Sequence, residues 1–192
     1  MFCLTCSHPS LWFAYYRYFN RLFIDIDWIF LYHYGMKNYE DISIALLLND
    51  FHNEYSMAVY KGARFVAEKM GISLAVFGVG SIDSPVQHMG MRNRLFSLVN
   101  PDDFDGIFYV SSSLSNYVGL ERFLDYIASF GDIPSAHVGI RHDSVRTFGI
   151  DNFTGMYDAV KHLITEHGRN KIAYISGTRG VYEAYERFRA YK

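Results

Sequence analysis

The stretch Gly149-Ile-Asp-Asn-Phe-Thr-Gly155, with its continuation to Lys171-Ile-Ala-Tyr-Ile-Ser176, decides the fold that we expect of this 192-residue chain. The first part predicts a strand end, a polar Asp-Asn turn and an amphipathic helix over 155–167 that stops at Gly168. The second part predicts a further buried strand. This order places the carboxylate of Asp151 at the edge of an α/β sheet, where open sheets of this kind bind ligands.

Strands and helices alternate through the rest of the chain from residue 36 onward. Continuous apolar runs predict strands buried on both faces of a parallel sheet. The expected strands are 42–48, 72–77, 105–110 and 136–139, and the expected helices are 58–70 and 120–130. This alternation predicts an α/β fold with a doubly wound parallel sheet and right-handed crossovers.

Composition and charge narrow the function classes. Half of the residues are hydrophobic, which suffices for a sizeable core, and the net charge is -2. The 18 Lys and Arg residues are scattered singly, unlike the concentrated basic surface of a nucleic-acid-binding domain. We therefore expect no direct nucleic-acid contact from this chain.

The cysteine pattern does not support a metal site. Cys3, Cys6 and His8 form C-x2-C-x-H, but a tetrahedral structural site needs four ligands and no second pair follows. The sequence predicts reduced thiols in a cytoplasmic protein, with no metal and no cofactor.

The N-terminal segment 1–35 differs from everything that follows it. Eleven aromatic residues crowd positions 12–34, yet the charges of Arg17, Arg21, Asp25 and Asp27 argue against a membrane span. A secretory signal pattern and a helix-turn-helix are also missing. We interpret 1–35 as an atypical segment upstream of a native start at Met36, so its deletion is expected to leave folding unchanged.

No set of residues indicates catalysis. Gly78-Val-Gly80 follows a predicted strand, but the third glycine and the acidic residue of a dinucleotide site are missing. His162 and His167 are five positions apart, so we expect them on different helical faces and exposed to solvent. No nucleophile has a base nearby in sequence, so we expect no enzyme activity.

Polar and aromatic residues instead follow successive strands at their carboxyl ends. Asp50 and Tyr55 come after the first strand, Ser111 after the third, and Asp151 after the fourth. Such positions converge on one crevice, where carboxylates bind ligand hydroxyls and aromatic rings pack on a sugar or base. The alternative for Asp50 and Asp151 is that each only caps the helix that follows it.

Several motifs resemble the ligand-binding domain of the lac-repressor/galactose-repressor (LacI/GalR) family. Asn53-Glu-Tyr-Ser56 stands where that family has Asn-Pro and two aromatics, and Asp105-Gly-Ile-Phe resembles its "DGII" strand. Gly149-Ile-Asp-Asn-Phe-Thr-Gly155 resembles its hinge, and residues 183–191 resemble its "A-x-x-R-x-x-G-Y/F" helix. Glu54, Ser56 and Ala190 depart from the pattern, so the identity of the ligand does not carry over.

The resemblance implies a type I periplasmic-binding-protein-like fold that is truncated. Residues 36–152 would form the first lobe, and 153–192 the crossover helix and the start of the second lobe. Tyr55 and Ser56 would contact a sugar-like ligand from the first lobe, Asp151 from the hinge and Arg187 from the second lobe.

Family members dimerise, so a homodimer is expected of the full-length protein. An incomplete second lobe exposes apolar surface and unpaired backbone, so we expect poor solubility and no high-affinity binding.

The resemblance leaves three functions open. The first is a sensor-domain fragment of a LacI/GalR-type transcription regulator with a small-molecule effector. The second is the same sensor module of a signalling enzyme such as a diguanylate cyclase or histidine kinase, which the missing helix-turn-helix favours. The third is a solute-binding protein, against which the missing signal peptide argues.

Overall fold

A single parallel sheet organises the computed structural model, which describes residues 39–177 and 181–192. Its strand order is β2-β1-β3-β4-β5, and every neighbouring pair is parallel. The strands are β1 (Ser43–Leu48), β2 (Ser73–Gly78), β3 (Gly106–Tyr109), β4 (Ser135–Val138) and β5 (Thr147–Phe148). The predicted α/β class with an all-parallel sheet is therefore confirmed. The predictions for residues 1–35, including Cys3, Cys6 and His8, concern residues outside those described.

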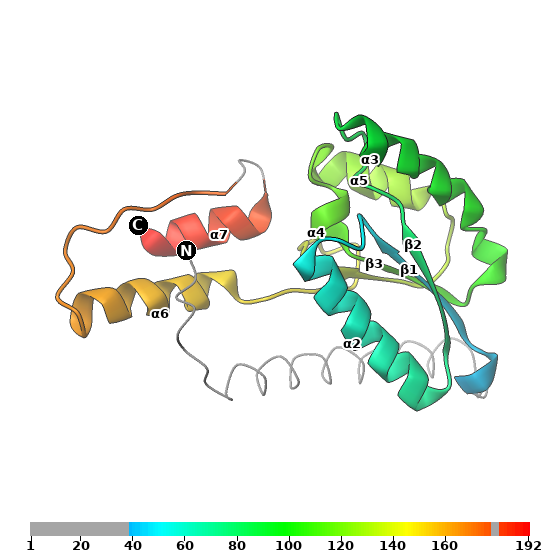
Figure 1. Cartoon of the computed structure of the whole chain (residues 1–192), viewed down its shortest axis with the longest axis horizontal. Helices are drawn as coiled ribbons and strands as arrows, with labels where there is room; N and C mark the ends of the chain where they lie inside the picture. Colours follow the sequence, from blue (N-terminus) through cyan, green and yellow to red (C-terminus); the bar gives the residue numbers. More distant parts are fainter. Residues whose placement is uncertain (1–38, 178–180) are drawn as a thin grey trace.

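Both faces of the sheet are covered, as the continuous apolar run of β1 predicts (Figure 1). Ala45 and Leu47 pack on one side with Phe123 of helix α5 (Gly119–Ala128). Leu46 and Leu48 pack on the other side with helix α2 (Glu54–Met70). Successive side chains of a strand point to opposite faces, so one apolar run supplies both cores.

Helix α2 begins earlier than the periodicity of its apolar residues predicts. The side chain of Asn53 accepts hydrogen bonds from the backbone N–H groups of Tyr55 and Ser56, which fixes the start of the helix at Glu54. The predicted end of this helix at Met70 is confirmed, because Gly71 adopts a left-handed conformation with φ 74°.

Several short helices are absent from the sequence-based expectation. They are η1 (Tyr39–Asp41), α3 (Gln87–Arg92), η2 (Asn93–Leu98), η3 (Pro101–Asp103) and α4 (Ser111–Leu114). Segments of one or two turns are too short for a helical period to emerge from the sequence. Asp105, directly before β3, is half-buried and accepts a 2.9 Å hydrogen bond from the backbone N–H of Ser43.

The C-terminal part of the chain forms an extension that we call the arm (residues 152–177 and 181–192). It contains α6 (Asn152–Thr165) and α7 (Tyr182–Tyr191), which pack on each other. Figure 1 shows the arm projecting from the body (residues 39–148), which holds the sheet. One extended connection after β5 joins the two parts.

The predicted strand over 171–176 is wrong. This segment is extended, but it pairs with no strand among the described residues. A parallel strand requires a neighbour to satisfy its backbone groups, so without one the segment is held by side chains instead. The ring of Tyr174 stacks on Tyr191 at 4.9 Å, and the Tyr191 hydroxyl donates a 2.7 Å hydrogen bond to the carbonyl of Ile172.

Within residues 39–177 and 181–192, no helix combines the length and the apolar character that crossing a bilayer requires.

Candidate functional site

A crevice of about 760 Å³ opens between the body and the arm, beyond the carboxyl ends of β4 and β5. This volume falls in the range of about 300–1,000 Å³ that is typical of small-molecule sites. Its walls are the loop after β4, the connection after β5, the first turn of α6 and one side of α7. Its charged lining residues are Arg141, Asp143, Asp151, Glu183, Glu186 and Arg189.

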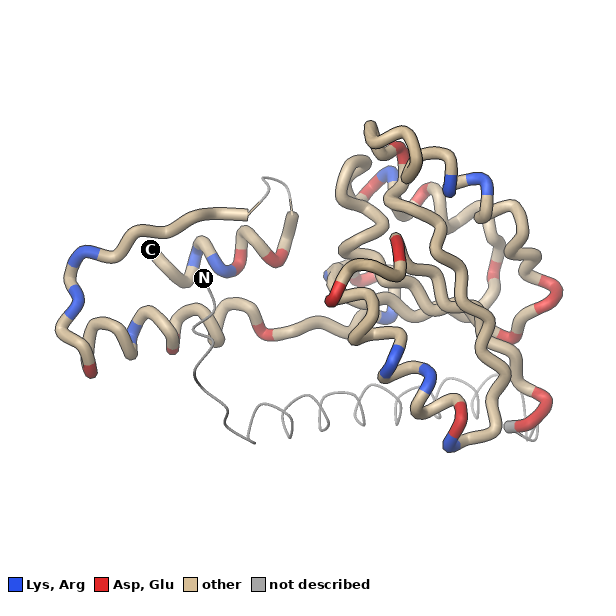
Figure 2. Tube along the Cα trace, viewed as in Figure 1, with Lys and Arg blue, Asp and Glu red and all other residues tan. Residues whose placement is uncertain are grey.

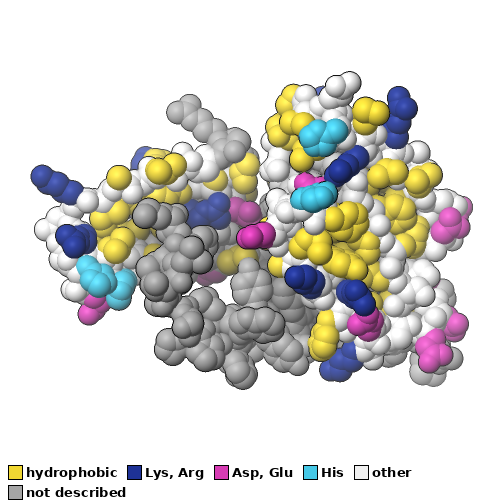
Figure 3. All heavy atoms as spheres, viewed as in Figure 1, with side chains coloured by type: hydrophobic (Ala, Val, Ile, Leu, Met, Phe, Trp, Pro, Cys, Tyr) yellow, Lys and Arg dark blue, Asp and Glu magenta, His cyan; other side chains and the backbone are white. Residues whose placement is uncertain are grey.

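Charges of both signs meet at this junction. Figure 2 shows acidic and basic positions interspersed along the described trace, and Figure 3 shows both kinds of side chain where the arm meets the body. Arg189 donates a 3.1 Å hydrogen bond to the buried Glu186, and its guanidinium lies 4.6 Å from the ring centroid of Phe153. Arg141 donates a 3.5 Å hydrogen bond to the hydroxyl of Tyr182. The crevice can therefore offer donors and acceptors to one ligand.

Gly139 brings three elements together at the inner end of the crevice. It follows β4 with φ 81°, and a Cβ atom placed there would collide with Ser112 and lie 3.1 Å from Glu183 Oε1. The Ser112 hydroxyl in turn donates a 3.4 Å hydrogen bond to the hydroxyl of Tyr55. Side chains from α4 and α7 thus approach a backbone position that only glycine occupies without strain, and Tyr55 of α2 joins them through Ser112.

Burial raises the pKa of the Glu183 carboxyl, and the neighbouring Arg187 opposes that rise. A carboxyl group with a raised pKa donates a hydrogen bond more readily than an ordinary surface carboxylate. By contrast, the hydrogen bond from the backbone of Thr154 lowers the pKa of Asp151, which therefore stays an acceptor.

Among the six predicted ligand-binding residues, Asp151 is the one that lines the crevice. Its side chain also accepts a 2.9 Å hydrogen bond from the backbone N–H of Thr154 and caps α6. The capping alternative is thus confirmed for Asp151, and capping does not remove it from the crevice. Asp50 does not cap α2, because Asn53 does.

Arg187 and Tyr55 lie close to the crevice but outside its lining. Arg187 is half-buried and donates a 2.6 Å hydrogen bond to the side chain of Asn152, which does line it. Tyr55 reaches the same region through Ser112. Ligand contact by either residue stays a prediction.

The other three predicted residues are buried and engaged with the protein. Asp50 accepts hydrogen bonds of 2.7 and 2.8 Å from the backbone of His52 and Asn53. Ser56 donates a 2.7 Å hydrogen bond to Asn49. Ser111 lies 2.9 Å from Nδ1 of His137. In this structure the three side chains hold the segments that follow β1 and β3, and a ligand contact stays a prediction for each.

Sequence reasoning missed the charged run Arg141-His-Asp143 and the first turns of α7. The run begins three residues after the last residue of β4, so the rule that ligands bind beyond the carboxyl ends of strands could have identified it. Nothing local to α7 distinguishes Tyr182 and Glu186 as lining residues, because the packing of α7 on α6 places them there.

Many of the solved structures that this fold resembles are LacI-family regulators and periplasmic-binding-protein-like domains. A LacI family transcriptional regulator from Mycobacterium smegmatis is 25% identical with a TM-score of 0.58, covering 77% of this chain and 49% of that chain. A periplasmic binding protein/LacI transcriptional regulator from Alkaliphilus metalliredigens QYMF, complexed with D-xylulofuranose, is 20% identical with a TM-score of 0.55, covering 78% and 50%. The lac repressor dimer bound to operator and the anti-inducer ONPF is 13% identical with a TM-score of 0.58, covering 85% and 52%.

These likenesses establish the fold as type I periplasmic-binding-protein-like. The chain spans about half the length of the structures that it matches. The sequence matches no family model and no curated protein.

Proposed function

We propose that this chain is part of the ligand-sensing domain of a LacI/GalR-type transcription regulator and binds a sugar-like molecule between body and arm. The observation that carries this proposal is the crevice itself, which both parts of the chain line with charged and aromatic side chains. A polyhydroxylated ligand donates hydrogen bonds to carboxylates such as Asp143 and accepts them from guanidinium groups such as Arg141. The rings of Phe153 and Tyr182 also line the crevice and suit the apolar face of a sugar.

The placement of the crevice suits a sensor rather than a catalyst. A ligand that contacts the body through Arg141 and the arm through Glu183 favours the arrangement in which both are in reach. Such a ligand shifts the population of body–arm arrangements, and a linked domain can respond to that shift. The proposal includes a binding role without catalysis and a cytoplasmic location. It also includes a dimer in the full-length protein, and the dimeric lac repressor structure supports this.

Weak sugar binding is the direct test. We expect saturation-transfer NMR on the 192-residue chain to detect pentoses, hexoses or disaccharides with dissociation constants on the order of millimolar. Arg141→Ala and Glu183→Gln should each weaken this binding, because each removes a polar group from the lining. Arg94→Ala is the matched control, since Arg94 is exposed on η2 outside the crevice. Binding that Arg94→Ala and Arg141→Ala change equally would contradict the proposed site.

The identity of the linked output domain is tested by sequencing the gene. Sequencing beyond both ends of this reading frame should identify an in-frame helix-turn-helix if the protein regulates transcription. A cyclase or kinase domain there would instead support the signalling-enzyme hypothesis.

A further inference from the structure

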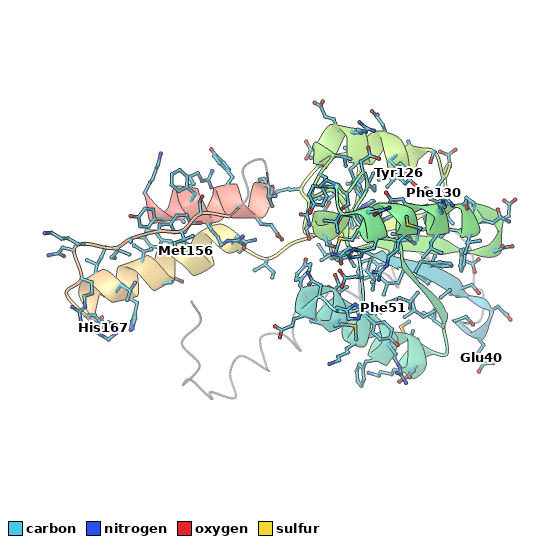
Figure 4. The ribbon with its side chains drawn as sticks, turned by 45° about the horizontal axis from the view of Figure 1, so that its top comes forward. Glu40, Phe51, Tyr126, Phe130, Met156 and His167 are labelled. Atoms are coloured by element: carbon cyan, nitrogen blue, oxygen red, sulfur yellow. The ribbon has the colours of Figure 1, made fainter. Side chains whose placement is uncertain are left out.

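Two histidines meet at the end of the arm farthest from the body. The Nε2 atoms of His162 and His167 are 3.2 Å apart, their ring centroids are 4.9 Å apart, and the ring planes are inclined by 81°. Figure 4 labels His167 at the end of α6, away from the sheet. The expectation that the two side chains lie on different helical faces is therefore wrong, although both are exposed as predicted.

The backbone conformation after α6 explains why the side chains of His162 and His167 are in contact. Helix α6 ends at Thr165, and Gly168 with φ 60° reverses the chain. The carbonyls of Leu163 and Ile164 accept backbone hydrogen bonds of 3.0 and 3.1 Å from Arg169 and Gly168, which close the turn. This closed C-terminal turn is a common helix end, and it folds His167 back over the last turn of the helix.

The distance between the two imidazoles matches the distance between two imidazole ligands of one metal ion. Zinc lies ~2.0–2.1 Å from imidazole nitrogens, and a tetrahedral angle then separates two such nitrogens by about 3.3 Å. With each ring pointing at the ion, the two ring centroids lie about 5 Å apart. The observed 3.2 and 4.9 Å agree with both values.

We propose that His162 and His167 form a binding site for a divalent transition-metal ion, with both Nε2 atoms as ligands and water completing the coordination. Imidazole nitrogens suit Zn²⁺, Ni²⁺ and Cu²⁺. The end of α6 adds the negative pole of the helix, which favours a cation within its last turn. Within the described residues no group of three or more His, Cys, Asp or Glu is placed to hold a metal, so this site has two protein ligands.

Cu²⁺ is the probe for the test, because it binds such sites most tightly among these ions. Every protein carries Cys3→Ser and Cys6→Ser, since free thiolates bind the same metals. We expect isothermal titration calorimetry to show one ion bound per chain at this site. The electron paramagnetic resonance spectrum should show coupling to two imidazole nitrogens.

His162→Asn and His167→Asn should each weaken Cu²⁺ binding at least about tenfold and leave coupling to a single imidazole nitrogen. His52→Asn and His88→Asn are the controls, because both residues are exposed on the body. Circular dichroism verifies that each variant folds as the parent does. Equal affinity and an unchanged spectrum in all four variants would overturn the proposal and leave only a hydrogen bond between the two imidazoles.

Discussion

The guanidinium of Arg187 donates a 2.6 Å hydrogen bond to the side-chain oxygen of Asn152, which joins α7 to the first residue of α6. Asn152 lines the crevice, and Asp151 next to it caps the same helix. Arg187 therefore positions one wall of the crevice in this structure. Because the same guanidinium lies near Glu183, it also influences the charge state of a lining carboxyl.

Removing Arg187 should raise the pKa of Glu183 further. Burial already raises this pKa, and the positive charge of Arg187 opposes the rise. In Arg187→Ala, the opposing charge is gone, so the carboxyl should titrate at higher pH than in the parent. NMR titration of the Glu183 side-chain carbon measures this, with Arg94→Ala as the control that leaves the pKa unchanged. A pKa that stays the same in Arg187→Ala would show that the two side chains do not interact.

Gly139→Ala should destabilise the protein by about 2 kcal/mol, from the left-handed backbone and the collision with Ser112. Gly149→Ala is the matched control, because nothing lies within 4 Å of a Cβ atom placed at Gly149. Urea denaturation of the two variants compares their free energies of unfolding. Equal free energies of unfolding would mean that the backbone at the end of β4 shifts to accommodate a side chain.

Stability should fall below neutral pH because His137 is buried. Burial lowers its pKa from 6.5 to about 4, so the unfolded chain binds the proton between these values and the folded chain does not. The stability that depends on the neutral His137 is fully present above about pH 6.5 and is lost as the pH falls toward 4. Its loss between pH 7 and pH 5 is about 2 kcal/mol.

Urea denaturation at pH 7 and pH 5 measures that loss for the parent and for His137→Gln. In His137→Gln, the free energy of unfolding should decrease less between pH 7 and pH 5 than it does in the parent. His52→Gln, which changes an exposed residue, should show the same decrease as the parent. An identical pH dependence in the parent and in His137→Gln would contradict a neutral, buried imidazole held between Ser111 and Ser135.

Tyr191→Phe should loosen the extended segment over 171–176. It removes the 2.7 Å hydrogen bond to the carbonyl of Ile172 and keeps the ring that stacks on Tyr174. A hydrogen bond of this kind contributes about 1 kcal/mol, so amide hydrogen exchange in the segment should accelerate about fivefold. Tyr185→Phe is the control, since Tyr185 is 58% exposed on the same helix. Equal exchange in both variants would show that the stacked rings alone hold the segment.

The sequence by itself determined the parallel α/β sheet and several helix ends. The apolar run of β1 is long enough to supply two faces, and such a run is stable only when helices cover both. Gly71 and Gly168 end helices because they adopt conformations that other residues avoid, so these stops are readable locally. The placement of Asp151 beyond a strand end follows from the same local reasoning.

Tertiary structure alone decided which polar side chains are buried, which reach the crevice, and whether 171–176 becomes a strand. Ser56 and Ser111 look alike in sequence to exposed loop serines, and only their partners Asn49 and His137 show that they are internal. Strand formation over 171–176 depends on a neighbouring strand, and no local pattern encodes one. Burial and pairing are properties of contacts between distant segments, so they emerge only when the chain is folded.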